Sequence, residues 1–306
     1  MTRTFVYQIS QSDSGTKITD FLKMRGYSRH ILTCLRHEEG SVRVNGAPVY
    51  MNYALRAEDQ LTIVIPEEEP SEHIVPSRLP FPIVYEDEDL MIINKPSDMP
   101  IHPSINNYEN TLANAAAWYF SQKGEAFVYR CINRLDRDTT GLLILAKNRL
   151  SGALLSEMSA RRQIHRQYLA IASGRLPECG TIDAPIARAE DSAILRRVDP
   201  EHGDRAVTHY RLLHFDGSYS LVLLQLETGR THQIRVHMNH IGHPLPGDYL
   251  YNPDYRIIKR QALHSYRLTF CHPISGKPMD FTAPVPDDFR LFACGCAELH
   301  QYADNG

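Results

Sequence analysis

The chain has 306 residues, of which 42% are hydrophobic and 23% are charged, and its formal net charge at pH 7 is -3. This composition is that of an ordinary globular protein, and the charge excludes a polyanion-binding surface spread over the whole molecule, so any such partner needs a local basic surface. The six cysteines form no C-x-x-C pair and no apolar run approaches the roughly 18 residues of a membrane span, so we expect reduced thiols, no membrane partner and a cytoplasmic location.

The first predicted elements are two short helices, a hairpin and a strand. Residues 16–26 place three apolar side chains on one helical face before a terminal glycine, and residues 28–40 repeat the pattern behind a capping serine. The dipeptide Asn45-Gly46 follows alternating valines, which is a strong hairpin signal. Residues 59–65 supply a further strand.

Basic residues are distributed over these N-terminal elements: Lys23, Arg25, Arg29, Arg36 and Arg43. The charges alone are compatible with a platform for RNA and with an ordinary solvated helix surface. The stretches "GSVRVNGAPV" and "LRAEDQLTI", however, resemble the RNA-binding domain first described in ribosomal protein S-four, over roughly residues 16 to 65. The resemblance implies that the helix pair and the hairpin bind structured RNA.

A composition shift follows in "PEEEPSEHIVPSRLPFP", residues 66–82, which combines an acidic run with five prolines. Proline restricts its own backbone and that of the preceding residue, and adjacent carboxylates repel one another, so the stretch is typical of a linker. We therefore expect an RNA-binding domain over residues 1–68, a linker over 69–80 and a catalytic body over 81–306.

The body shows more strands than helices. Its predicted strands cover residues 83–85, 90–93, 142–146, 167–174 and 219–230, and its predicted helices cover 112–120, 148–163 and 231–242. Hairpin-like spacings dominate, which favours an α+β fold with a mostly antiparallel mixed sheet.

Fifteen histidines raise the question of a metal site, and four of them, His232, His237, His240 and His243, lie within twelve residues. Helical spacing places His232 on a different face from His237 and His240, no H-E-x-x-H is present, and no cysteine lies nearby to complete a site. We therefore expect no metal, and histidines that lie on the helix surface or contact RNA.

The stretch "INRLDRDTTGLLILAKN", residues 132–148, combines a charged turn with an apolar strand. In extended backbone Arg134 and Asp136 point to one side and Leu135 points to the other, into the core. An acid at the mouth of a rigid strand is well placed to act as a nucleophile or base, although the charge pattern alone favours a surface ion-pair network.

A second basic element favours the role of nucleophile or base for Asp136 over that of a surface ion pair. Arg235 lies on the predicted helix of "THQIRVH", with Thr231, His232 and Asn239 near its face, and a guanidinium there can hold a partly buried carboxylate in its ionised form. Between residues 130 and 166, Lys and Arg outnumber Asp and Glu by 8 to 3, which is the local basic patch that a polyanion partner requires.

Five sequence blocks occur in an order that is specific to one family. "EDEDLMIINKPSDMPIHPS", "NRLDRDTTGLLILAKN", "RQYLAIASG", "ETGRTHQIRVHMNHIGHPLPGDYLY" and "LHSYRLTFCHPISGKPMDFTAPVP" together resemble the A-type pseudouridine synthases of the large ribosomal subunit, over roughly residues 80 to 288. The resemblance implies that Asp136 is the catalytic aspartate, that Tyr168 is the tyrosine of the next strand and that Arg235 pairs with the aspartate. Many members have histidine where this chain has Asn133.

The chemistry of that family explains these residue types. Uridine becomes pseudouridine when its nitrogen glycosidic bond breaks, the uracil turns, and a carbon of the ring joins the ribose. Glycoside hydrolysis usually uses two carboxylates, whereas an isomerase that keeps its leaving group and excludes water can use one. Tyr168 would stack on the flipped uracil, and Arg134 and Arg137 would contact RNA.

The resemblance therefore predicts a cofactor-free, monomeric RNA pseudouridine synthase. Ribosomal RNA is the favoured substrate because of the N-terminal module, and transfer RNA is the alternative within the class. A non-catalytic RNA-binding protein and a zinc nuclease are the alternatives from other classes.

Overall fold

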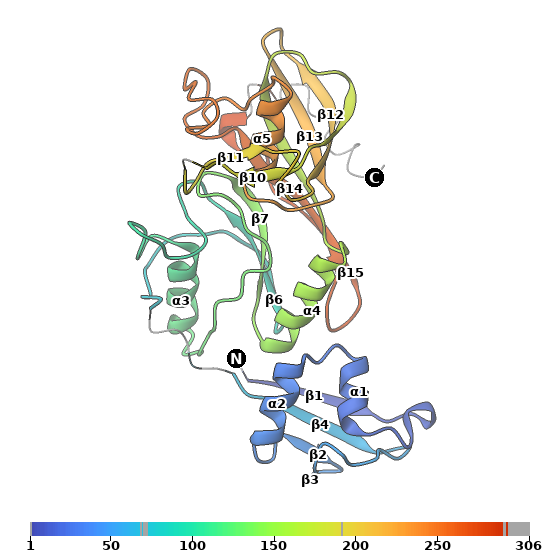
Figure 1. The fold of residues 1–306 in the computed structure, drawn as a ribbon. Coiled ribbons are helices and arrows are strands. Elements are labelled where there is room, and N and C mark those ends of the chain that lie inside the picture. Colours follow the sequence, from blue (N-terminus) through green and yellow to red (C-terminus); the bar gives the residue numbers. More distant parts are fainter. Residues whose placement is uncertain (1, 68, 70–72, 191, 290–291, 293–306) are drawn as a thin grey trace.

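The computed structural model describes residues 2–67, 69, 73–190, 192–289 and 292. The N-terminal unit is a four-stranded antiparallel sheet, in the order β1-β4-β2-β3, with two helices beside it (Figure 1). Its elements are β1 (Arg3–Gln8), a 3₁₀ turn (Gln11–Asp13), α1 (Ile18–Met24), α2 (Arg29–His37), β2 (Val42–Val44), β3 (Ala47–Pro48) and β4 (Gln60–Ile65). The predicted helices, hairpin and last strand are confirmed, and β1 is a strand that the sequence patterns did not reveal.

Local signals fix these N-terminal elements. The Ser28 side chain accepts a hydrogen bond from the Ile31 backbone N–H, so it caps α2. Asn45 and Gly46 both have positive φ, as the two-residue turn between β2 and β3 requires.

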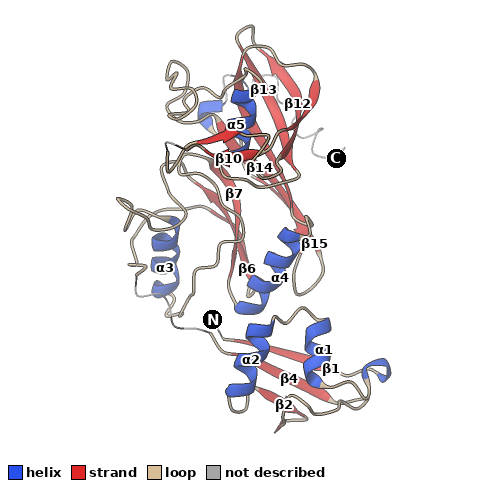
Figure 2. Ribbon diagram, viewed as in Figure 1, coloured by secondary structure: helices blue, strands red, loops and turns tan. Residues whose placement is uncertain are grey.

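The body is built on a nine-stranded sheet that runs in the order β5-β6-β7-β14-β8-β13-β12-β9, with β15 beside β14 (Figure 2). All of its pairings are antiparallel except that of β7 with β14, which confirms a mostly antiparallel mixed sheet. The strands are β5 (Ile83–Glu86), β6 (Leu90–Lys95), β7 (Thr140–Ala146), β8 (His165–Ser173), β9 (Cys179–Asp183), β12 (Val207–Phe215), β13 (Tyr219–Leu226), β14 (Leu263–Cys271) and β15 (Pro278–Thr282). A separate hairpin joins β10 (Ile186–Arg188) to β11 (Arg196–Val198).

Helices cover both faces of this sheet. The core of one face includes side chains of α3 (Leu112–Gln122) and α5 (Gln233–His240), together with the alternate β8 residues Tyr168, Ala170 and Ala172. On the other face α4 (Arg149–Ala160) packs against β6, β7 and β14, and a 3₁₀ turn (Asp287–Phe289) packs against the opposite side of β8. The alternation along β8 therefore decides that Tyr168 faces the same side as α5.

The N-terminal unit packs against the body through α4. Leu150 is buried in the hydrophobic cluster of the N-terminal unit, with Leu154 packed at its edge, and Figure 1 shows α4 between that unit and the long sheet. Gly26 lies close to this contact: a Cβ there would lie 2.3 Å from Leu154 Cδ2, so the Leu154 side chain would have to shift. Arg3 adds ion pairs to Asp89 and Glu88, at 3.1 and 2.7 Å. The interval predicted as a linker lies between the two sheets, with residues 68 and 70–72 outside the described range.

Candidate active site

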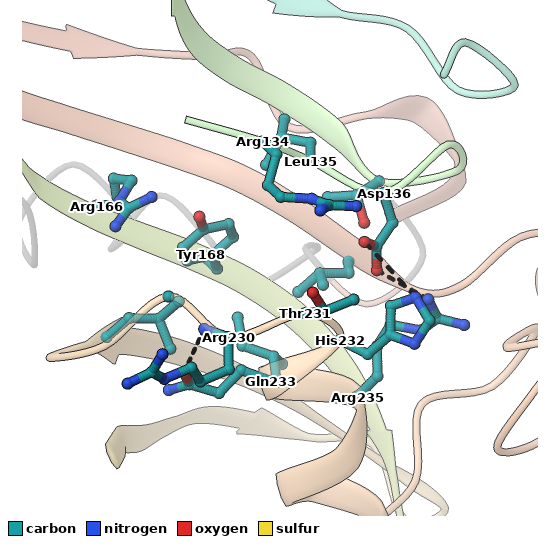
Figure 3. Close-up of a pocket in the computed structure, with 15 residues that line it drawn as sticks. Arg134, Leu135, Asp136, Arg166, Tyr168, Arg230, Thr231, His232, Gln233 and Arg235 are labelled. Atoms are coloured by element: carbon teal, nitrogen blue, oxygen red, sulfur yellow. Dashed lines mark hydrogen bonds and ion pairs between the residues drawn. The ribbon is translucent and has the colours of Figure 1, made fainter. Parts of the chain in front are cut away.

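The segment that carries Asp136 lies outside any strand and leads through a turn into β7. Leu135 is buried in the core, Arg134 is exposed, and the Asp136 side chain is 18% exposed at the edge of a hollow (Figure 3). The burial of Leu135 agrees with its predicted place in the core, although all three residues line the hollow. The Asp136 carbonyl also accepts a hydrogen bond from the Thr139 backbone N–H, which closes the turn into β7.

Arg235 joins Asp136 to a second, buried carboxylate. Its Nη1 donates to Asp136 Oδ2 at 2.8 Å, while Nε and Nη2 donate to the two oxygens of Asp248 at 2.6 and 2.7 Å. Arg235 and Asp248 are both almost fully buried. Burial by itself would lower the pKa of Arg235, but the hydrogen bonds and charges of Asp248 and Asp136 raise that pKa above its ordinary value. The guanidinium therefore stays charged and leaves Asp136 Oδ1 without an arginine partner.

His232 approaches the other oxygen of the Asp136 carboxylate. Its Nε2 is 3.9 Å from Asp136 Oδ1, and its Nδ1 is 3.2 Å from the Tyr251 hydroxyl. The backbone of His232 has φ of 58° at the N-terminus of α5, a conformation that costs a non-glycine residue about 1–3 kcal/mol. Burial lowers the pKa of His232 to about 4, against the attraction of Asp136, so its imidazole is neutral at pH 7.

Lys95 holds the same segment through its backbone. Its ammonium group is buried and donates to the backbone carbonyls of Pro96, Met99 and Arg137, at 2.7, 2.9 and 2.7 Å. Burial lowers the pKa of Lys95 to about 7, and the charges of Asp138 and Asp136 act in the opposite direction. The lysine thereby ties the residues after β6 to the loop that carries Asp136.

The hollow beside Asp136 is formed mainly by three segments of the body. Tyr168 of β8 contributes a ring that is 4% exposed, and Arg134 and Arg166 flank it in Figure 3. Residues 229–235 form the opposite wall, and Leu226 and Leu263 complete the lining. The structure thus brings Asp136, Tyr168, Arg235 and Arg134 to one cavity, although Asp136 and Arg235 are 99 residues apart in the chain.

The basic patch predicted between residues 130 and 166 is largely neutralised. Six of its eight cations have a hydrogen-bond or ion-pair partner: Arg130 (Glu67), Arg137 (Asp138), Lys147 (Glu86), Arg149 (His30), Arg161 (Glu157) and Arg162 (Glu227). Arg134 and Arg166, the two that line the hollow, have no such partner among the described residues. The free positive charge of this stretch is therefore concentrated at the cavity.

The basic residues of the N-terminal unit fall into two groups. Lys23 pairs with Asp20 at 3.0 Å, Arg25 lies over the Phe21 ring near Asp13, and Arg43 donates to the Gly40 carbonyl. Arg29 and Arg36 are exposed on α2, seven residues apart, and no described residue pairs with either side chain.

The four clustered histidines face different partners. His237 is buried between Thr208 and the Ala184 carbonyl, which corrects its expected place on the helix surface, and His243 faces the Ser173 carbonyl. Asn239, expected beside Arg235, is instead exposed on another surface hollow with His240.

A possible ligand set for a metal ion in the described part of the chain consists of Asp87, Asp89 and His272. Its oxygens already accept from the Tyr85 hydroxyl, the Leu90 backbone, Arg3 and Asn148, so these residues form a structural network at the contact between the two units. Within the described ranges, no helix is both long and apolar enough to cross a membrane.

Two features of the site were missed by the sequence patterns. The sequence patterns assigned no role to Asp248, which is buried and orients Arg235, and none to Lys95. An acid surrounded by apolar residues was the available signal for Asp248, and a lysine directly after a buried strand was the signal for Lys95.

Comparisons of the sequence and the structure with known proteins identify the family. Residues 89–240 match the family model described as RNA pseudouridylate synthase. An uncharacterized RNA pseudouridine synthase of Bacillus subtilis, YjbO, is 40% identical over 88% of this chain and 95% of its own length. The ribosomal large subunit pseudouridine synthase D of Escherichia coli is 42% identical over 75% of this chain and 74% of its own. The solved structure of human RNA pseudouridylate synthase domain containing 1 aligns with a TM-score of 0.61, at 26% identity, over 78% of this chain and 98% of that one.

The chain therefore belongs to the RNA pseudouridylate synthase family. As an RNA pseudouridine synthase it is an isomerase that acts on RNA.

Proposed function

We propose that this enzyme isomerises uridine in structured RNA, most favourably large-subunit ribosomal RNA, with Asp136 as its one catalytic carboxylate. The observation that carries the proposal is the position of Asp136: a partly exposed carboxylate, held by the buried Arg235, at the edge of a cavity lined by Tyr168. Arg235 holds one of its oxygens in a charge-assisted hydrogen bond. The other oxygen is then free to act on the ribose or the base of a flipped uridine.

Tyr168 provides the surface on which the flipped uracil stacks, a contact worth about 1–3 kcal/mol per base. This offsets part of the few kcal/mol that extrusion of a nucleotide from its stack requires. Uridine and pseudouridine are isomers, so the reaction needs neither an oxidant nor an energy source, and we propose that it proceeds without a cofactor. Arg134, exposed at the same cavity, contacts the RNA backbone or fills the place of the extruded base.

The nature of the RNA substrate rests on two supports. Several relatives, including those of Haemophilus influenzae and Zymomonas mobilis, are named ribosomal large subunit pseudouridine synthase D. The N-terminal stretches "GSVRVNGAPV" and "LRAEDQLTI" also resemble the S-four-type domain, and we propose the division into an RNA-binding domain (1–68), a linker (69–80) and a catalytic domain (81–306) in a monomeric A-type enzyme. In this proposal Lys23, Arg25, Arg29, Arg36, Arg43 and Arg137 contact RNA.

The proposal is tested by comparing the wild-type enzyme with Asp136→Asn. Total RNA from a strain without the gene is incubated with each protein, and new pseudouridines are mapped in the ribosomal and transfer RNA fractions. We expect modification of large-subunit RNA by the wild type and a loss of about 10³-fold or more in the variant, near the upper range for a positioned acid or base. RNA binding should be retained, because the amide side chain keeps the shape of the site. Normal conversion by Asp136→Asn would overturn the assignment of the carboxylate, and new sites only in transfer RNA would overturn that of the substrate.

A further inference from the structure

Arg166 is a cation with an unmet hydrogen bond inside the active-site cavity. Its Nε is buried and has no acceptor, and no described residue forms an ion pair or hydrogen bond with its guanidinium. Two nearby arginines differ, since Arg161 pairs with Glu157 and Arg162 pairs with Glu227. A buried donor without an acceptor destabilises the folded protein. Nε itself is closed to solvent, so an acceptor supplied by a ligand would meet the terminal Nη groups, which belong to the cavity lining and have no hydrogen-bond or ion-pair partner among the described residues.

The position of Arg166 along β8 indicates which part of a ligand it meets. Arg166 and Tyr168 are two residues apart in a strand, so they face the same side, about 6.6 Å apart along the chain. Figure 3 shows the Tyr168 ring between Arg166 and Asp136. If the proposed function holds, the glycosidic carbon lies at Asp136 and the uracil lies across Tyr168. The edge of the base opposite the glycosidic bond then points toward Arg166.

The isomerisation leaves the same kind of group at this edge of the base in the substrate and in the product. In uridine the ribose is bonded to N1, and the ring atom directly opposite is C4, which carries the carbonyl oxygen O4. In pseudouridine the ribose is bonded to C5, and the ring atom opposite is C2, which carries O2. A half-turn about the axis through N3 and C6 exchanges N1 with C5 and C4 with C2. A carbonyl oxygen therefore occupies the same position before and after the reaction.

We propose that Arg166 binds the carbonyl oxygen opposite the glycosidic bond, O4 in the substrate and O2 in the product. During the reaction the C1′–N1 bond breaks, the C1′–C5 bond forms, C5 loses a proton and N1 gains one. Arg166 takes no part in these transfers. It is a specificity residue that holds the detached base in the cavity and exchanges one carbonyl for the other as the ring turns.

The same contact selects uridine over cytidine. Cytosine carries an amino group on C4, so a cytosine in this position would present a donor to the Arg166 donor. Both groups would then remain unpaired in a cavity that excludes water, and sites built on a buried hydrogen bond discriminate strongly against a ligand that lacks it.

The experiment uses the full-length enzyme and the variants Arg166→Met and Arg166→Lys. The matched control is Arg161→Met, which removes an exposed arginine that already has a partner. Pseudouridine formation at the mapped uridine is measured at saturating RNA, together with release of free uracil. We expect a fall of about 10- to 100-fold for Arg166→Met, the effect of losing one charged hydrogen bond, with uracil release. Arg166→Lys should recover part of the rate, and Arg161→Met should match the wild type.

Two further measurements separate a base contact from a phosphate contact and from a structural role. In the inactive Asp136→Asn background, binding is compared between the RNA with uridine and the RNA with cytidine at the mapped site, with and without Arg166→Met. We expect the preference for uridine to fall by at least about tenfold, with an unchanged dependence of affinity on salt. An unchanged preference would overturn the proposal, and so would a salt slope that falls by about one, the sign of a lost phosphate contact. If the wild type forms no pseudouridine in any fraction, the proposed function fails, a result distinct from failure of Arg166 alone.

Discussion

The charges around Asp136 and the charges of the N-terminal unit are organised in opposite ways. At the active site Arg235 is almost fully buried and shared by two carboxylates, and Lys95 is buried among three carbonyls. On α2 Arg29 and Arg36 extend into solvent, and no described residue pairs with them. The same kinds of side chain therefore serve one region as fixed structure and the other as mobile surface charge.

This difference in burial determines how each region responds to substitution of a charged residue. A buried charge that loses its partner keeps its desolvation cost, so the network around Arg235 fails as a unit. Exposed cations act through screened and nearly additive interactions, so each contributes a small, salt-dependent increment. Substitutions in the two regions should consequently differ both in size and in the kind of measurement that reveals them.

The largest effect is expected for Arg235→Ala. It leaves Asp136 and the buried Asp248 without their cation, which costs on the order of 3–5 kcal/mol in the free energy of unfolding. Urea denaturation measures this loss. The double variant Arg235→Met/Asp248→Leu removes the unpaired buried acid as well, and it should recover part of the stability but none of the activity.

Arg256→Ala serves as the control for this comparison. Its pair with Asp254 is exposed, so its removal should leave stability near the wild-type value. An equal loss of stability in Arg235→Ala and Arg256→Ala would contradict the distinction between the buried and the exposed region.

A smaller effect is expected from acidification. Burial lowers the pKa of His232 to about 4 and that of His264 to about 3, from the ordinary value of 6.5. Between pH 6.5 and about 4 the unfolded chain therefore binds protons that the folded chain does not, and stability should fall as pH is lowered through this window. Below the folded pKa both states are protonated and this contribution stops changing.

Thermal denaturation between pH 7 and 4 checks the sign of this effect. His232→Gln should flatten the dependence, whereas His202→Gln, at a side chain that is 78% exposed, should not. A wild-type protein that becomes more stable on acidification through this window would show that these imidazoles are not buried in their neutral form.

The elements that could be predicted from sequence are those with local causes. Ser28 and Asn148 cap their helices through side-chain hydrogen bonds to nearby backbone, and each appears as a short motif. β1 was not predicted because Phe5 is its only buried residue, so it has no apolar alternation. The parallel pairing of β7 with β14 joins residues more than 120 apart, and no local pattern records such a contact.

The same limit applies to the candidate site. Asp136 and Arg235 could be predicted from the sequence because each stands in a motif with a regular spacing. The 2.8 Å contact between them agrees with the predicted pair. The role of Lys95 could not be predicted from the sequence, because its three acceptors are backbone carbonyls, which every residue carries. In the sequence Arg166 is only one of the eight cations between residues 130 and 166. It differs from its neighbours because the fold leaves its Nε without an acceptor.

The smallest effect is expected at the exposed region, from the double variant Arg29→Ala/Arg36→Ala. The two residues are seven apart on α2 and therefore lie on one helix face. If both contact phosphates, the slope of log affinity against log salt should fall by about two, with little change in the free energy of unfolding. RNA binding at several salt concentrations measures this slope, and Arg161→Ala is the control for a cation that already has a partner.

Point substitutions test this surface more cleanly than deletion of the N-terminal unit. Deletion would expose Leu150 and Leu154 of α4 and remove the Arg3 pairs to Asp89 and Glu88, so a loss of binding would mix lost contacts with damage to the body. Arg29 and Arg36 have no such structural partner among the described residues, which isolates their electrostatic contribution. An unchanged salt slope in the double variant would remove α2 from the RNA surface.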